Sequence, residues 1–364
     1  MKFSLFFELQ PDDASRAAER RVFAECVEQA MLADELGYHE VWAVEHHGLQ
    51  EYSHCSAPEV LLGFLAGRTK KIRLGHGVTL TPHRFNHPIR VAERVAALDI
   101  LSEGRVDWGS GKSSSRVEQD AFEVDRAELD SQWQEAISMI PRMWRSDVFE
   151  WQGTHYHIPP TTILPKPVQR PHPPIFVACS RPESLEVAGK LGAGSLSFTA
   201  GNDEYLAAKV RSYRTAIASA HPPAGMVNNR FCCTPTTLVL EDDRKACEHG
   251  FRGSRVFQES LSSYFYSRQK AGESLDISRD PLSSAQLAKA MAERNTPGSP
   301  LNAVVGDPKS AIETIARFQA VGVDELILVM QMGTIPHEII MESLRTFAAK
   351  VMPHFASEAV SSAR

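Results

Sequence analysis

The chain has 364 residues, of which 43% are hydrophobic and 23% charged, and its formal net charge is -6. Its length permits one large domain or two ordinary ones. The acidic balance argues against a dedicated nucleic-acid or anionic-membrane binder, because both need a basic surface. No apolar run approaches the ~20 residues of a membrane helix, and the start lacks a signal-peptide pattern. Six cysteines without a CxxC spacing do not make a disulfide scaffold, so we expect a cytoplasmic protein.

Strand and helix patterns alternate along most of the chain. Apolar, β-branched runs predict eight strands, at residues 2–9, 41–44, 72–80, 105–109, 174–178, 195–198, 234–240 and 325–330. Helical spacing of apolar residues predicts the helices between them, at 19–36, 58–66, 88–101, 129–145, 183–191, 204–220, 309–321 and 335–351, with another opening at 243–250. Eight strands is the number that closes a (β/α)8 TIM barrel, an α/β fold. A doubly wound open sheet is the alternative.

Two segments depart from this alternation. Residues 150–173 are rich in proline and histidine, which predicts an extended excursion with little helix. Residues 250–300, between the seventh and eighth strands, begin with aromatic side chains and continue with a polar, glycine-bearing stretch, which is typical of a lid. We expect a single domain over residues 1–355 and a disordered tail over 356–364.

Three ionisable side chains follow the second predicted strand. The run at 41–44 is apolar, and Glu45, His46 and His47 come directly after it. A parallel strand that is buried on both faces cannot bury these side chains unpaired, because a charge in a low dielectric is costly. We therefore place them at the carboxyl end of the strand, which is where TIM barrels hold their active sites.

Two loops have features of anion-binding sites. The first, Gly-Ser-Gly-Lys-Ser at 109–113, resembles a P-loop, but Val106 stands where that motif needs a glycine. A glycine-relaxed backbone with Lys112 and several hydroxyls still suits a phosphate, although an ordinary loop is the alternative. The second follows the fifth strand, where Ser180 and Glu183 fit a capping box. It is either a capped helix alone or a helix whose N–H groups also bind phosphate.

The histidine pairs do not predict a metal site. His46 and His47 diverge along a strand end, and Pro88 interrupts any helix that would join His83 and His87. The third pair, His155 and His157, lacks a carboxylate or cysteine nearby. A GxGxxG fingerprint is also absent, which argues against a Rossmann nicotinamide site. His76 lies between Gly75 and Gly77, and is either a barrel-core histidine or a neighbour of a flat ligand.

Several motifs in the same order resemble those of the bacterial luciferase-like flavin-dependent monooxygenases. The resemblance runs from residue 1 to about 355 and is weakest at 250–300. The motifs are Met-Lys-Phe at the start, Val-Trp-Ala-Val-Glu-His-His at 41–47, Leu-Gly-His-Gly-Val-Thr-Leu-Thr-Pro at 74–82, His-Pro at 87–88, Leu-Asp-Ile-Leu-Ser-Glu-Gly-Arg at 98–105, Pro-Lys-Pro-Val-Gln at 165–169, Pro-Pro-Ile-Phe-Val-Ala at 173–178 and Val-Gly-Asp-Pro at 305–308.

This resemblance implies a TIM barrel with an insertion lid between strand 7 and strand 8. It implies an FMNH₂- and O₂-dependent two-component monooxygenase, which acts through a flavin hydroperoxide on a small, largely apolar organic substrate. A separate NAD(P)H:flavin reductase would supply the reduced FMN, and the chain would pair as a homodimer. The alternatives are an F420-dependent hydride-transfer oxidoreductase of the same superfamily and a non-catalytic flavin-binding relative.

The resemblance also assigns roles to residues. His46 falls on the catalytic histidine, whose pKa near neutrality suits an acid or base. A cis peptide under the flavin ring would fall at Gly77–Val78, and Lys112 stands where luciferases carry a phosphate-contacting arginine. The implied cofactor-binding set is His47, Gly77, Val78, Lys112, Ala178, Cys179, Ser180 and Ser184. The sequence departs from the pattern where Cys179 replaces a glutamate, where Gly111 replaces a cysteine beside the flavin and where Asp130 falls near an expected arginine.

Overall fold

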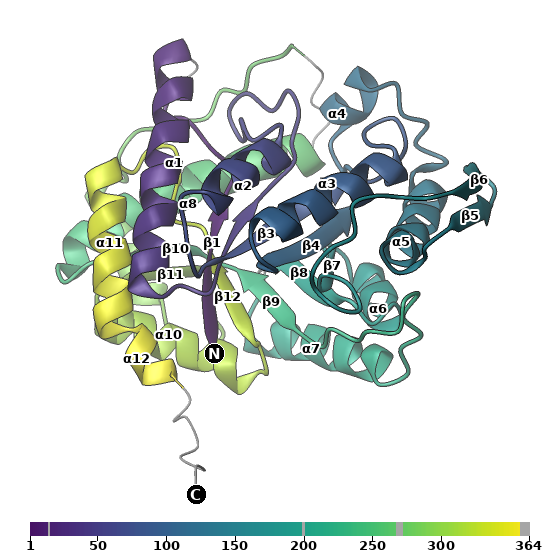
Figure 1. Ribbon diagram of the computed structural model, residues 1–364. Coiled ribbons are helices and arrows are strands. Elements are labelled where there is room, and N and C mark those ends of the chain that lie inside the picture. The colour runs from purple at the N-terminus through teal and green to yellow at the C-terminus, as the bar shows by residue number, and fades with distance from the viewer. Residues whose placement is uncertain (14, 199–200, 267–271, 357–364) are drawn as a thin grey trace, which may run out of the picture.

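Eight parallel strands form a closed barrel in the computed structural model, which describes residues 1–13, 15–198, 201–266 and 272–356 (Figure 1). The barrel strands are β1 (Lys2–Phe7), β2 (Glu40–Ala43), β3 (Arg73–Leu80), β4 (Val106–Gly111), β7 (Ile175–Ala178), β8 (Gly194–Phe198), β9 (Phe231–Thr234) and β12 (Glu325–Leu328). Neighbouring strands follow one another in chain order, and β1 pairs in parallel with both β2 and β12. The predicted α/β TIM barrel is confirmed.

Most of the helices lie outside the barrel wall (Figure 1). Helix ends follow local sequence signals: the Ser15 side chain accepts the N–H of Ala18 at the first helix, and Gly37, at φ +83°, ends it. None of the described helices combines the length and apolar character that a bilayer span needs. The helices are α1 (Arg16–Leu36), α2 (Pro58–Ala66), α3 (Pro88–Leu101), α4 (Arg116–Ala121), α5 (Leu129–Arg145), α6 (Pro182–Lys190), α7 (Asp203–Ile217), α8 (Asp243–Tyr266), α9 (Ser284–Glu293), α10 (Pro308–Ala320), α11 (His337–Lys350) and α12 (Met352–Phe355).

The seventh barrel strand differs from the prediction. The sequence places it at 234–240, but the wall contains β9, and the run after Pro235 forms β10 (Thr236–Val239) instead. Strand β10 leaves the barrel and pairs in parallel with β11 (Ala303–Gly306). Pro235 lacks the N–H that a continuous ladder needs, so it separates the two strands. Both runs are fully buried, and for this reason hydrophobicity alone does not distinguish them.

The two segments that depart from the alternation, residues 150–173 and 250–300, lie before and after β9 in the chain. Residues 150–173 contain no helix, as predicted, and their first part is an antiparallel hairpin of β5 (Phe149–Gln152) and β6 (His157–Thr161). The predicted insertion lies between the seventh and eighth barrel strands and includes α8 and α9. The first part of the 250–300 segment is therefore helical, and 267–271 lie outside the described residues. The tail expected at 356–364 also lies outside them, apart from Ala356.

The end of the barrel at which the strands begin holds a buried charge network. The guanidinium of Arg230 lies 3.2 Å from Glu325 and 3.9 Å from Glu40, and it also binds Asp107. Burial raises the pKa of Glu40 well above its usual value, and the neighbouring acids add to this rise. The α-amino group of Met1 donates to the carbonyl of Phe355 at the same end (3.1 Å).

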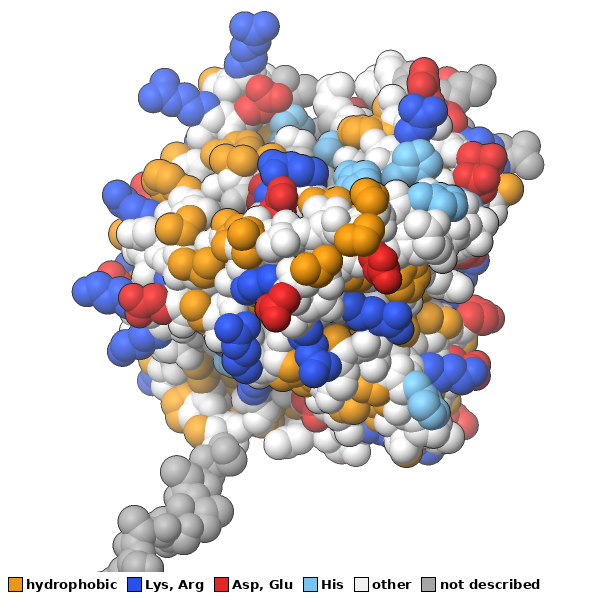
Figure 2. All heavy atoms as spheres, turned by 45° about the vertical axis from the view of Figure 1, so that its right-hand side comes forward, with side chains coloured by type: hydrophobic (Ala, Val, Ile, Leu, Met, Phe, Trp, Pro, Cys, Tyr) orange, Lys and Arg blue, Asp and Glu red, His pale blue; other side chains and the backbone are white. Residues whose placement is uncertain are grey.

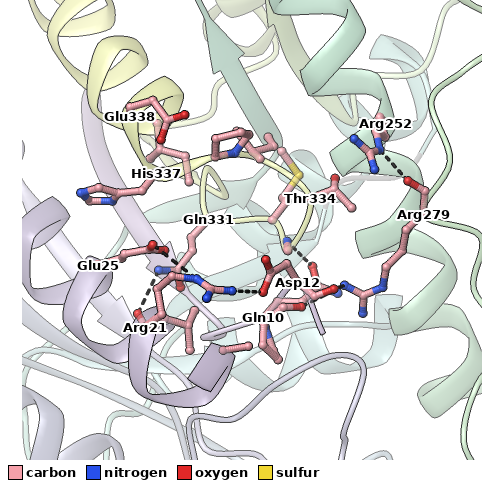
Figure 3. Close-up of a pocket in the computed structure, with 18 residues that line it drawn as sticks. Gln10, Asp12, Arg21, Glu25, Arg252, Arg279, Gln331, Thr334, His337 and Glu338 are labelled. Atoms are coloured by element: carbon pink, nitrogen blue, oxygen red, sulfur yellow. Dashed lines mark hydrogen bonds and ion pairs between the residues drawn. The ribbon is translucent and has the colours of Figure 1, made fainter. Parts of the chain in front are cut away.

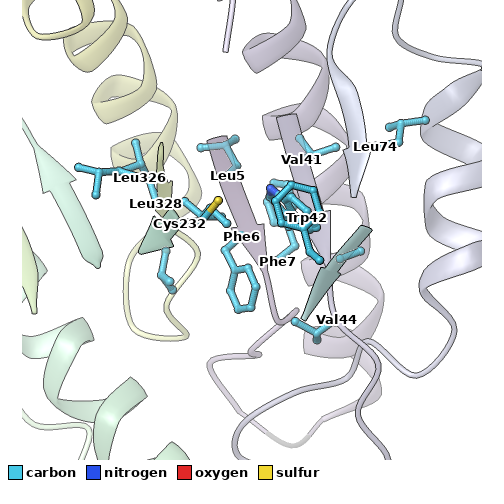
Figure 4. Packing of buried hydrophobic residues seen from close by; sticks show 14 of the residues in the cluster. Leu5, Phe6, Phe7, Val41, Trp42, Val44, Leu74, Cys232, Leu326 and Leu328 are labelled. Carbon is cyan, nitrogen blue, oxygen red and sulfur yellow. The ribbon is translucent and has the colours of Figure 1, made fainter. Parts of the chain in front are cut away.

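Aromatic side chains fill the middle of the barrel. The Trp42 ring lies edge-to-face with Phe176, with centroids 5.0 Å apart. Gly75 makes room for Trp42, because a Cβ at Gly75 would stand 2.4 Å from that ring. Figure 4 shows buried side chains of β1, β2, β9 and β12 packed side by side in this core. The core fills the inside of the barrel, and in TIM barrels the active site lies at the carboxyl ends of the strands.

Candidate functional site

His46 lies between two carboxylates at the carboxyl end of the barrel. Its Nδ1 lies 2.9 Å from Oε1 of Glu118 on α4, and its Nε2 lies 3.8 Å from Oε2 of Glu8, which follows β1. The imidazole remains 17% exposed. The ring of Phe265, near the end of α8, meets it edge-on at 5.5 Å. The sequence therefore places this histidine correctly at the rim of a closed barrel.

The two carboxylates favour the imidazolium form of His46. Burial lowers its pKa, but the charges of Glu118, Glu8 and Glu45 outweigh burial and raise the pKa to about 9. Burial raises the pKa of Glu118, yet His46 and the hydrogen bonds from Ser113 and the His47 N–H bring it below its usual value. At neutral pH the pair is an imidazolium bound to a carboxylate.

Glu8 brings a second, less satisfied carboxyl group to the same histidine. Its side chain is 1% exposed, and its Oε1 accepts the hydroxyl of Tyr52 at 2.6 Å. Its Oε2 has no hydrogen-bond partner among the described residues. Burial raises the pKa of Glu8, while His46 and Tyr52 lower it in part. An unpaired buried oxygen facing the imidazole is available to a bound molecule.

His47 points into a different environment from His46. Its Nε2 lies 3.3 Å from Glu45, whose other oxygen accepts the N–H of Leu80 at the end of β3. Its ring stacks on Phe85 and tilts against Phe122, at centroid distances of 6.2 and 4.6 Å. Neighbouring residues of one extended segment point in opposite directions, which explains the divergence. The predicted cofactor contact of His47 stays a prediction.

The predicted non-proline cis peptide is present between Gly77 and Val78. Both residues are half-buried, and the pairing register of β3 with β4 shifts between His76 and Thr79. The side chain of Val78 leans over the glycines of β4, because a Cβ at Gly111 would stand 2.5 Å from its Cγ2. The glycine at 111 therefore allows the close approach of these two strands.

Two cationic side chains, Lys112 and Arg181, follow the ends of β4 and β7. Burial lowers the pKa of Lys112, and the nearby guanidinium of Arg181 lowers it further. Lys112 also binds Asp130, and its Nζ lies 5.6 Å from the Trp133 ring. Two positive charges in one region favour the binding of an anion there. The phosphate role of Lys112 stays a prediction, and Arg181, to which the sequence assigned no function, adds a second positive charge in this region.

The loop after β7 holds the other predicted contacts. Ala178 and Ser180 are exposed there, whereas the thiol of Cys179 is buried, and burial raises its pKa to about 12. The Cys179 N–H donates to Leu196 (2.7 Å), so Cys179 mainly shapes the loop. The predicted capping box of Ser180 and Glu183 is wrong by one residue. Helix α6 begins after Arg181, whose N–H donates to the Ser184 hydroxyl at 3.2 Å, because Pro182 occupies the favoured first position.

His76 is a core histidine. It is 3% exposed, and neither ring nitrogen has a partner among the described residues. Burial lowers its pKa to about 3, so the ring is neutral. Of the two alternatives that the sequence left open, burial favours core packing. Its flanking Gly75 serves Trp42 instead of a ligand.

One cluster of metal-ligand type occurs in the described part of the chain, at the opposite end of the barrel. It consists of His39, Glu40 and Glu325. The Nε2 of His39 lies 3.0 Å from Arg230 and 3.1 Å from Lys2, so side-chain cations already lie beside the cluster. The expectation of no metal site stays a prediction.

Sequence reasoning missed the acidic partners of His46. Glu8 carries a signal of the same kind as Glu45, a carboxylate directly after an apolar strand. Glu118 carries no such signal, because it stands 72 residues from His46 on a short helix, and only the closed barrel brings the two together. Arg181 follows the fifth strand, where a cation was not expected to face Lys112.

Comparison with known proteins identifies the family of the chain. Residues 1–325 match the Luciferase-like monooxygenase family. The chain is 27% identical over 373 residues to the flavin-dependent trigonelline monooxygenase, oxygenase component, of Acinetobacter baylyi, a match that covers 99% of this chain and 97% of that protein. It is 31% identical over 188 residues to the F420-dependent glucose-6-phosphate dehydrogenase of Microbacterium testaceum, covering 50% of this chain and 54% of that protein.

A solved structure supports the same relationship. The monooxygenase RslO1 from Streptomyces bottropensis is 29% identical, with a TM-score of 0.82, and the match covers 98% of this chain and 100% of that chain. The similarity thus extends over the barrel and the insertion between its last two strands.

Proposed function

Because the chain belongs to the Luciferase-like monooxygenase family, we propose that it is the oxygenase component of a two-component monooxygenase that uses FMNH₂ and O₂. The observation that carries the proposal is the His46 site, an imidazolium between Glu118 and Glu8 at the barrel mouth. It lies toward the same end of the barrel as the cis peptide at Gly77–Val78 in β3 and as Lys112 and Arg181, which follow β4 and β7.

The residues at the mouth fit a planar phosphorylated ring. Gly109 and Gly111 let Val78 pack against β4, and Gly77 and Val78 remain partly accessible. Lys112, Arg181 and the first turn of α6 would hold the phosphate, with Ser180 exposed at the same turn. Bound reduced FMN would activate O₂, so that one oxygen atom enters the substrate and the other leaves as water.

The protein's own groups would control protons and exclude water. His46 at Nε2 would donate a proton toward the reacting oxygen, and Glu118 would hold the ring in place through Nδ1. Glu8, with its unpaired oxygen, would take up or return that proton. Water exclusion matters because solvent that reaches activated oxygen diverts it into H₂O₂.

The insertion between β9 and β12 would act as the lid. The hydroxyl of Tyr264 binds the carboxylate of Glu51, and the Leu275 N–H donates to the same side chain at 3.0 Å. These two bonds hold Tyr264 and Leu275, which lie on either side of residues 267–271, at the loop after β2. The ring of Phe265 packs against His46. Residues 250–300 would open to admit substrate and close for the reaction.

A small, largely apolar substrate would suit the aromatic side chains that pack near the carboxyl ends of the strands. Phe6 and Phe198 meet edge-to-face at 6.0 Å, and Phe257 lies 6.4 Å from Phe198. Tyr52 closes this aromatic group on the His46 side. Such rings offer apolar contact area and few hydrogen bonds, which favours hydrophobic molecules.

Two partners belong to the same proposal. An NAD(P)H:flavin reductase would deliver reduced FMN in the cytoplasm, in agreement with the name "oxygenase component" of the Acinetobacter relative. A second copy of the chain would cover the apolar face of α2 and α3, where Val60, Phe64 and Leu101 are 69%, 54% and 71% exposed. Figure 2 shows apolar side chains interrupting the charged surface on the side that carries these helices.

Hydride transfer with F420 is the second candidate, because an F420-dependent dehydrogenase is also similar over half of the chain. Aerobic single turnovers with FMNH₂, labelled O₂ and a panel of aldehydes, ketones, terpenes and aromatics separate the two. We expect one labelled oxygen atom in a product. The His46→Gln variant should form none while binding FMN within about threefold of wild type. Full product formation by His46→Gln would remove His46 from the reaction.

A further inference from the structure

A cavity of about 480 Å³ lies beside the carboxyl end of the barrel. Its walls come from the loop after β1, from α1, from α8 and from the loop that joins β12 to α11, with Arg279 reaching in from the insertion (Figure 3). The side chain of Gln10 forms one wall, donating to the carbonyl of Glu51 at 2.9 Å and accepting the N–H of Gly333 at 3.1 Å. None of the residues assigned to FMN lines this cavity.

One side of the cavity is cationic. Arg252 donates through Nε to the carbonyl of Arg279 at 2.6 Å, and Arg279 donates to the carbonyls of Pro11 and Asp12. Neither guanidinium forms an ion pair with a carboxylate in the described part of the chain. Two half-buried arginines that bind only carbonyls retain positive charge for an anion.

The other side of the cavity is acidic. Figure 3 shows Glu25 and Glu338 on the side opposite Arg252 and Arg279. Burial raises the pKa of Glu25, which lies 3.8 Å from Arg21, while Arg21 itself is bound at 2.5 Å to Asp12. His337 also lines this side, and its Nε2 is bound to Glu28 at 3.0 Å. Because Arg21 and His337 each have a carboxylate partner already, Glu25 and Glu338 leave this side of the cavity with negative charge in excess.

An unsatisfied buried amide lies on the same wall. Gln331 is 4% exposed and lines the cavity, and its Oε1 has no partner among the described residues. Its Nε2 donates to the carbonyl of Val22 at 3.4 Å. A buried acceptor without a donor costs free energy that a ligand N–H recovers.

We propose that this cavity binds a small zwitterion, with its carboxylate on Arg252 and Arg279 and its ammonium group facing Glu25 and Gln331. Opposite charges on opposite walls favour a molecule that carries both a positive and a negative group. A molecule with charge of only one sign would be repelled by one wall or would leave that wall unpaired. The site is separate from oxygen transfer and does not depend on FMN.

Calorimetric titration of the flavin-free protein tests the charge pattern directly. Three probes of equal chain length differ only in their end groups: γ-aminobutyrate carries both charges, succinate two negative charges and putrescine two positive charges. We expect γ-aminobutyrate to bind at least about tenfold more tightly than either of the others. Equal or tighter binding of succinate or putrescine, or no saturable heat with any probe, overturns the proposal.

Variants on both walls locate the binding. Arg252→Gln and Glu25→Gln should each weaken γ-aminobutyrate by about tenfold. The matched control is Arg255→Gln on the same helix, since Arg255 also binds insertion carbonyls, those of Ser278 and Asp280, but does not line the cavity. Wild-type affinity in folded Arg252→Gln or Glu25→Gln, or an equal loss in Arg255→Gln, contradicts the site. Because the two variants lie on opposite walls of the cavity, one still tests the site if the other fails to fold.

Discussion

The imidazole of His46 and the carboxylate of Glu118, 72 residues apart in the chain, form a direct 2.9 Å contact between Nδ1 and Oε1. The same carboxylate oxygen accepts the N–H of His47 at 3.0 Å, and the other oxygen accepts the hydroxyl of Ser113. Glu118 therefore ties the loop after β2 to the loop after β4. The orientation and the charge of His46 both depend on this one buried acid.

Replacing Glu118 with Gln should lower the pKa of His46 from about 9 toward ~6.5, its ordinary value. The protonated form is lost as pH rises through the pKa in the folded protein, so the upper pH limit of oxygenation should fall by a similar amount. NMR titration measures the pKa of His46, and product assays over a pH range measure the upper pH limit of oxygenation. The control is Glu123→Gln, because Glu123 is 81% exposed and makes only a distant ion pair. An unchanged His46 titration would contradict the role of Glu118.

The same pair should contribute to stability in a defined pH range. Because the folded-state pKa of His46 is raised, its contribution is complete below ~6.5 and is lost as pH rises toward about 9. The difference in free energy of unfolding between wild type and Glu118→Gln should therefore shrink over that interval. Denaturant unfolding at several pH values measures it. A difference that grows with rising pH would show that the histidine is not held as a cation.

Lys112 should carry phosphate affinity. Changing it to Met should weaken FMN binding by about tenfold, ~1.4 kcal/mol, measured by fluorescence quenching. Asp130→Asn should act in the opposite direction, because Asp130 binds the same ammonium group and competes with phosphate for it. The control is Lys190→Gln at the far end of α6, where Lys190 is paired with Glu186. Tighter FMN binding by Lys112→Met would contradict a contact between Lys112 and the phosphate.

Gly111 should be needed for the shape of β4. A Cβ there would stand 2.5 Å from Cγ2 of Val78, so Gly111→Ala should cost ~1–3 kcal/mol of stability. Shortening the neighbour in the double variant with Val78→Ala should restore most of it, and the coupling is read from a double-mutant cycle in urea. Additive losses in the double variant would contradict the contact.

Arg230 should stabilise the opposite end of the barrel. Arg230→Met leaves Asp107, Glu40 and Glu325 with fewer cations, which we expect to cost ~3–5 kcal/mol. The loss should shrink at acid pH, since protonation removes the unpaired charges. The control is Arg214→Met, because Arg214 and its partner Asp324 are 31% and 38% exposed and such a pair contributes only ~0–1 kcal/mol. Equal losses in both variants would contradict the network.

The fold was largely predictable because barrel strands and helices carry distinct periodicities. The exception is the seventh strand, where Pro235 divides two buried runs and pattern alone chose the wrong one. Long-range pairing determines which of the two runs joins the barrel wall, because β10 pairs with β11, which lies over sixty residues later in the chain. Sequence patterns cannot rank such pairings.

The site was predictable only in part. His46 follows the end of a strand that the sequence marks clearly, whereas the cis peptide at Gly77–Val78, inside β3, was expected only from the family resemblance. Glu118 and Arg181 act through proximity to residues far away in the chain, which appears only when the barrel closes. The cavity at Arg252 and Arg279 also escaped notice, because its walls come from both ends of the chain and from the insertion.

Anaerobic titration of the purified protein with FMNH₂ and, separately, with reduced F420 tests the central claim most directly. The account predicts saturable binding of FMNH₂ in the micromolar range, at least about tenfold tighter than reduced F420, and weakened by Lys112→Met. Preference for reduced F420, or no binding of FMNH₂ by protein whose fold is intact, would contradict it.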